Sequence, residues 1–143
     1  MPGLSEIDFG QIEGLTIHQV LEQFPELQPH LDDLHDMELT SPGGESRRGF
    51  VERVMATFLG LIDQYEGQKI VVVCHGGVIS SFYAQLEQGP VNDFVRYAVA
   101  NCSVSHFIVT PEQTLIQMWN DIKHLDEVQE GPVKLIPSLM EGR

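Results

Sequence analysis

Cations and cysteines are both scarce in this sequence. Its 143 residues hold 8 Lys and Arg against 21 Asp and Glu, so the formal net charge is −13 at pH 7. A chain this acidic has no basic stripe for neutralising phosphates, and we expect it to bind neither nucleic acid nor an acidic membrane surface. Its two cysteines, Cys74 and Cys102, are too few for a disulfide framework or for a zinc site of their own. We interpret both as buried thiols in strands.

Long apolar runs and targeting signals are missing as well. No run approaches the length of a membrane span, and the residues from Met1 to Glu6 contain neither the basic region nor the apolar segment of a signal peptide. We therefore expect a cytoplasmic protein with no membrane partner. With 42% hydrophobic and 20% charged residues, residues 1–143 have the composition and length of a single globular domain.

The most informative stretch is residues 69–79, KIVVVCHGGVI. Its apolar, mostly β-branched run predicts a strand buried on both faces, as inside a parallel sheet. His75 would lie at the carboxyl end of this strand, where Gly76 and Gly77 let the backbone turn tightly and approach a ligand before a helix over residues 78–87. Ligands bind at this end of open α/β sheets, and the free N–H groups of a helix start suit a phosphate. The alternative for His75 is a turn residue bonded only to backbone.

Two further helices are predicted before this stretch. Thr16 and Gln19 have the spacing of a capping box, which predicts a short helix that ends before Pro25. Apolar residues recurring at intervals of three and four predict a longer helix over residues 45–65. The connection between these helices lacks periodicity, and we interpret it as a solvated acidic loop. A metal cluster there is the weaker alternative, because the spacing of the possible ligands fits no closed site. These ligands would be His30, Asp32, Asp33, His35 and Asp36.

After the glycine-rich turn, the pattern changes to strands. Residues 101–110 and 114–119 alternate in polarity on either side of a Pro-containing turn, which predicts a hairpin. The tail, residues 120–143, shows no periodicity that predicts an element.

Four motifs, in this order, resemble those of the histidine phosphatase superfamily, which has the phosphoglycerate mutase-like fold. They are residues 4–10 (LSEIDFG), residues 44–46 (GES) with Arg53, residues 73–78 (VCHGGV) and residues 101–104 (NCSV). The resemblance covers about residues 4–125. It implies a three-layer α/β/α domain with a mostly parallel sheet and a C-terminal antiparallel hairpin.

The resemblance also implies a reaction, phosphoryl transfer through a phosphohistidine, with no metal or other cofactor. Carried over by motif, His75 is the second histidine that holds the phosphoryl oxygens and Glu6 is the acid that protonates the leaving oxygen. We expect Gly76, Gly77 and Glu13 to contact the substrate, a small phosphorylated metabolite. Glu13 also competes with Glu6 for the role of acid.

The sequence departs from the family at one important place, because it contains no Arg-His-Gly motif, which carries the nucleophile. We expect that the N-terminal portion of the family is missing and that the 143-residue chain is inactive. The alternative is a nucleophile-less fragment or scaffold that binds anions or a protein partner without turnover. Without a neighbouring strand, residues 70–73 would be half-covered, which favours strand pairing between two copies and a possible homodimer.

Two other classes of enzyme match this sequence poorly. An esterase of the α/β-hydrolase type needs a Gly-x-Ser-x-Gly elbow after a strand, and residues 44–49 (GESRRG) are one residue too long for it. A cysteine-based phosphatase needs an arginine six residues after its nucleophile, and the residue six positions after Cys74 is Ser80.

Overall fold

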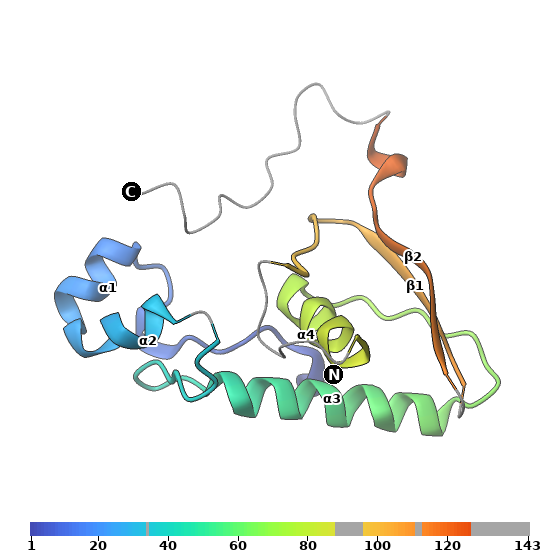
Figure 1. The fold of residues 1–143 in the computed structure, drawn as a ribbon, viewed down its shortest axis with the longest axis horizontal. Helices are drawn as coiled ribbons and strands as arrows, with labels where there is room; N and C mark the ends of the chain where they lie inside the picture. Colours follow the sequence, from blue (N-terminus) through green and yellow to red (C-terminus); the bar gives the residue numbers. More distant parts are fainter. Residues whose placement is uncertain (34, 88–95, 111–112, 127–143) are drawn as a thin grey trace. The chain divides into compact units, whose positions relative to one another are not determined.

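The computed structural model describes residues 1–33, 35–87, 96–110 and 113–126 (Figure 1). The chain divides into two compact units, Met1–Tyr97 and Ala98–Arg143, which are described separately below. Within the described residues, no helix combines the length and the apolar character needed to cross a membrane.

Four helices form most of the first unit. They are α1 (Ile17–Gln23), α2 (Gln28–Asp32), α3 (Arg47–Gln64) and α4 (Gly76–Leu86), with three short 3-10 turns, η1 (Pro2–Leu4), η2 (Gly10–Ile12) and η3 (Pro25–Leu27). The predicted capping box is confirmed, since the Thr16 side chain accepts from Gln19 N while the Gln19 side chain accepts from Thr16 N. Local sequence therefore fixes where α1 begins.

The core of this unit lies between α3 and α4 (Figure 1). The apolar stripe that predicts α3 is confirmed, because Phe50 and Val54 are completely buried. Phe58 of α3 stacks on Phe82 of α4 with 4.1 Å between ring centroids. A separate small cluster lies beside α1 and α2. It consists of Val20, Leu27 and Leu39, with Ile12, Leu15, Phe24 and Leu31 packed against it.

The apolar run before His75 corrects one prediction. Residues 70–73 are extended but form no strand, and the exposed fractions of Val71 and Val73 are both 92%. A strand becomes buried only when neighbours cover its faces and pair with its backbone, and within the described residues no strand pairs with this run. The predicted buried central strand is therefore wrong here, while the half-covered state is confirmed. The mostly parallel, three-layer sheet is not seen among the described residues.

The second unit holds the predicted hairpin. Strands β1 (Val104–Val109) and β2 (Thr114–Asp121) pair antiparallel, with Val109 opposite Thr114 at the turn, and η4 (Lys123–Leu125) follows. Phe107 and Trp119 meet edge to face across the strands, with 6.1 Å between ring centroids. The hairpin is confirmed, and β2 extends two residues beyond the predicted end.

Neither cysteine is the buried strand thiol that the sequence predicts. Cys102 is exposed, in a turn just before β1, with a φ of 60°. Cys74 is half-buried at the end of the unpaired run. The prediction for Cys102 assumed a strand that begins before Val104, where β1 starts. The prediction for Cys74 assumed a strand that does not form.

We expect the exposed valines to drive self-association of the chain. The double variant Val71→Lys/Val73→Lys should lower the association constant at least tenfold, because two ammonium groups cannot be buried in a paired apolar strand. Analytical ultracentrifugation at tens of micromolar measures this. The matched control is Ile17→Lys/Leu59→Lys, which changes the charge equally at other exposed apolar positions. A parent chain that sediments as a stable monomer would contradict the expectation.

Candidate active site

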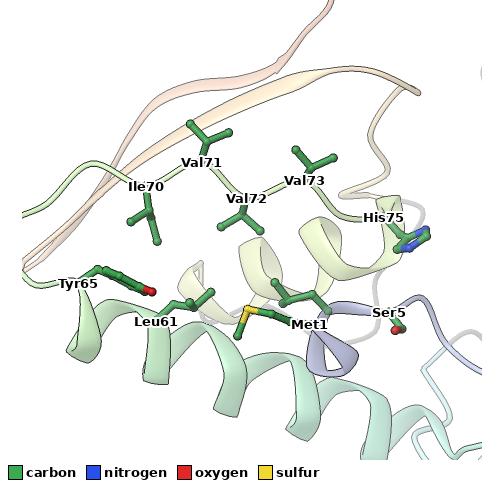
Figure 2. A pocket seen from close by; sticks show the side chains of 10 residues that line it. Met1, Ser5, Leu61, Tyr65, Ile70, Val71, Val72, Val73 and His75 are labelled. Carbon is green, nitrogen blue, oxygen red and sulfur yellow. The ribbon is translucent and has the colours of Figure 1, made fainter.

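The structure places His75 where the extended run meets α4. His75 is the N-cap residue of this helix, with extended φ and ψ of −105° and 165°, and its ring is exposed. Figure 2 shows it at one end of a cavity of about 610 Å³, with Ser5 on the opposite wall. This is the position that the sequence predicts for a ligand-binding histidine, at the start of a helix of 11 residues.

The carboxylate of Glu6 lies at the same helix start, although 71 residues separate it from its partner. Gly77 N donates a hydrogen bond to Glu6 Oε2 at 2.9 Å, and Ile7 N donates to Oε1 at 3.1 Å. A charge-assisted bond of this kind contributes about 1.5–3 kcal/mol, and the positive end of the helix dipole favours the same negative charge. The structure therefore brings together Glu6 and the His75 segment, as the sequence predicts.

The absence of a side chain at Gly77 leaves room for the Glu6 carboxylate. A Cβ atom added to Gly77 would lie 2.3 Å from Glu6 Oε1, which is far inside van der Waals contact. The sequence predicts that Gly77 approaches a phosphate, but here its N–H donates to a side chain of the same protein. Gly76, the first residue of α4, stays exposed. A phosphate bound beside His75 would therefore share the helix start with a carboxylate.

Most of the residues that line the cavity beside His75 have apolar side chains. Figure 2 shows Ile70 and Val72 pointing toward the helices, while Val71 and Val73 point away. The lining includes one side chain that can carry a positive charge, that of His75. Its other lining residues are Met1, Leu4, Ser5, Leu61, Tyr65, Ile70, Val71, Val72 and Val73. Among the described residues, no three His, Cys, Asp or Glu side chains lie close enough to hold a metal ion.

Glu13 occupies a different place from the one predicted. It follows η2, its side chain is exposed, and its carboxylate takes part in none of the hydrogen bonds that the described residues make around Gly77. The start of α1, a few residues further on, is capped by Thr16 and Gln19. Of the two competing carboxylates, Glu6 is the one that accepts a hydrogen bond at the start of α4.

Sequence reasoning missed the residues that fix residues 2–8, called the N-terminal acidic loop from here on. Arg53 of α3 donates to main-chain carbonyls of this loop, and Glu45 accepts from Asp8 N at 3.2 Å while pairing with Arg53. Their spacing of eight residues marks only a family landmark in the sequence. It does not reveal contacts that join residues about fifty positions apart.

Comparison with known proteins agrees with this geometry. Residues 1–122 match the histidine phosphatase superfamily (branch 1). The chain belongs to this superfamily. It is 27% identical over 129 residues to a metal-independent phosphoserine phosphatase of Arabidopsis thaliana, covering 90% of this chain and 52% of that protein. It is 30% identical over 126 residues to phosphoglycerate mutase-like protein 4 of the same plant, covering 87% and 53%. The chain thus spans about half the length of these relatives.

Solved structures show the same fold. The α-ribazole phosphatase of Shigella flexneri superposes with a TM-score of 0.72 at 23% identity, covering 85% of this chain and 59% of that one. A protein of Bacillus stearothermophilus, YhfR, gives 0.74 at 22% identity, covering 88% and 62%. These neighbours have the α/β phosphoglycerate mutase-like fold, so the fold class of this chain is α/β.

The thiol of Cys74 lies close enough to Glu6 to sense the charge of its carboxylate. Burial raises the pKa of the Cys74 thiol, and the negative charge of Glu6 raises this pKa further, against a lowering by the His75 backbone N–H. A thiol with a raised pKa is a poor nucleophile at neutral pH, which argues against cysteine-based phosphatase chemistry at this residue.

We expect Glu6→Gln to make Cys74 more reactive. Removing the negative charge lowers the pKa of the thiol, so more thiolate is present below that pKa, and the iodoacetamide alkylation rate at pH 8 should rise about twofold. The measurement uses a Cys102→Ser background, so that Cys74 alone reacts. Glu13→Gln, which removes the same charge elsewhere, is the control and should leave the rate unchanged. Equal rates for the parent and Glu6→Gln would show that Glu6 lies away from Cys74.

Proposed function

We propose that this chain supplies the phosphoryl-holding and proton-donating half of a histidine phosphatase site that acts on a small phosphorylated metabolite. The observation that supports this most strongly is the hydrogen bond between the Glu6 carboxylate and Gly77 N, two residues from His75. It joins two of the four sequence motifs at one point. The names of the relatives, a phosphoserine phosphatase and a phosphoglycerate mutase-like protein, point to the same substrate class.

In this proposal His75 and Glu6 have separate roles. His75, exposed at the start of α4, donates from its ring to an oxygen of the phosphoryl group, and the helix dipole adds to the attraction. Glu6, in its protonated form, gives a proton to the oxygen that leaves phosphorus and is left as the carboxylate. The attacking group is the histidine of an Arg-His-Gly motif, which this sequence does not contain. The chain alone therefore cannot form the covalent phosphohistidine by the family's route.

We propose that residues 70–73 become a buried strand when another strand pairs with them. The run already has the extended backbone and the alternation of half-covered and exposed side chains that a strand needs. A mostly parallel, three-layer sheet within a single domain would follow from such pairing.

A scaffold without turnover is the second candidate function. Two observations favour it: His75 is the one side chain in the cavity lining that can carry a positive charge, and the adjoining run exposes two valines. Such a chain would bind an anion or a protein partner and release it unchanged.

Phosphatase assays on two forms of the chain test the proposal. The 143-residue chain should hydrolyse p-nitrophenyl phosphate no faster than buffer, because it lacks the nucleophile. A longer form, in which a histidine phosphatase Arg-His-Gly segment precedes residue 1, should turn over, and His75→Ala should lower its kcat/KM at least a hundredfold. His18→Ala, a helix-surface substitution, is the control.

Three results would contradict the proposal. Turnover by the 143-residue chain that disappears in His75→Ala would reveal a nucleophile within it. Equal activity of His75→Ala and the parent in the longer form would place the chemistry elsewhere. A longer form that binds phosphate without turnover would favour the scaffold.

A further inference from the structure

Arg53 makes a fan of hydrogen bonds to one short segment of the chain. Its Nη1 atom donates to the main-chain oxygens of Pro2, Gly3 and Ser5 at 3.3, 3.0 and 3.1 Å. Its Nη2 atom lies 3.5 Å from the main-chain oxygen of Glu6. These carbonyls end the 3-10 turn η1, where the partial negative charge of the backbone favours a cation. The guanidinium therefore holds the backbone on the N-terminal side of Glu6.

Glu45 holds the same loop on the other side of Glu6. Its Oε1 atom accepts from Asp8 N at 3.2 Å, and its own backbone N donates to Asp8 O at 2.9 Å. Glu45 also pairs with Arg53, through Nε to Oε2 at 3.2 Å and through Nη2 to Oε1. The two side chains are only 27% and 25% exposed, so solvent screens this pair less than it would screen a surface ion pair.

Close packing keeps η1 on this face of α3. A Cβ atom added to Gly3 would lie 2.0 Å from Oγ1 of Thr57, which follows Arg53 by one helical turn. The Thr57 hydroxyl in turn donates to Arg53 O at 2.7 Å. The turn thus rests directly on α3, and Arg53 meets its carbonyls from a rigid helix.

We propose that Arg53 and Glu45 are positioning residues that aim the Glu6 carboxylate at Gly77 N. The backbone on both sides of Glu6 is held by this pair, whereas its side chain reaches across to α4. Planar guanidinium geometry matters here, because one group must serve several carbonyls and a carboxylate at once. This inference rests on the proposed role of Glu6 as proton donor, but its test needs no turnover.

The alkylation rate of Cys74 serves as the position sensor, in the full 143-residue chain with Cys102→Ser. Arg53→Gln should raise this rate at pH 8 about twofold, as Glu6→Gln does, because a released loop carries the Glu6 charge away from the thiol. The sign is diagnostic. Direct loss of the Arg53 positive charge would stabilise the thiolate less and would lower the rate. In the Glu6→Gln background, Arg53→Gln should change nothing further.

Arg48→Gln is the matched control for this experiment. Arg48 lies on the same helix and also pairs with a glutamate, Glu38. Both side chains are largely exposed, and the hydrogen bonds of this pair among the described residues do not involve residues 2–8. The alkylation rate of Cys74 in Arg48→Gln should equal that in the parent. Arg53→Lys, which keeps the charge but loses the planar fork, should give an intermediate rate. It decides the question if thermal unfolding shows that Arg53→Gln is not folded.

The outcomes separate two kinds of failure. If Glu6→Gln raises the rate but Arg53→Gln and Arg53→Lys leave it unchanged or lower it, the positioning role is wrong and the proposed acid survives. Equal gains from Arg53→Gln with and without the Glu6 carboxylate would also overturn the positioning role. If Glu6→Gln itself has no effect, the placement of Glu6 fails, and both proposals fail with it.

Discussion

One hydrogen bond, from Gly77 N to the Glu6 carboxylate, connects the parts of this chain that carry chemistry. It joins the N-terminal acidic loop to the start of α4 across 71 residues, at the positive end of a helix. The glycine leaves room for this bond, because a side chain there would displace the carboxylate from its observed position. Arg53 and Glu45 bind the backbone of this loop on either side of Glu6. The position of the Glu6 carboxylate therefore depends on α3 as much as on α4.

The electrostatics of the site limit how well it could hold a phosphate by itself. A chain with a net charge of −13 repels anions at long range, so local groups must supply the attraction. The cavity lining offers the His75 side chain for this purpose, and a carboxylate already occupies one N–H at the helix start. Further cations are needed to balance the negative charge of a phosphoryl group during its transfer. The missing Arg-His-Gly motif is where this family carries its nucleophile and one of these cations.

The features that could be predicted from the sequence are those that depend on residues close to one another along the chain. The capping box at Thr16, the buried stripe of α3 and the β1–β2 hairpin depend on residues close to one another in the sequence, and the structure confirms all three. Residues 70–73 were predicted as a buried strand and are not, because burial depends on partners that lie far away along the chain or outside it. The helix start at Gly77 was recognised as an anion site, but its observed anion is a side chain of the same chain. Arg53 and Glu45 gave no local signal for contacts with residues 2–8.

A pH titration of the Gly77 amide by NMR tests the central claim most directly. An amide proton that donates to a carboxylate changes its chemical shift when that carboxylate takes up a proton. The structure predicts a pH-dependent change in the chemical shift of the Gly77 amide that disappears in Glu6→Gln and remains in Glu13→Gln. A Gly77 amide with no such step, or one whose step survives in Glu6→Gln, would contradict the account.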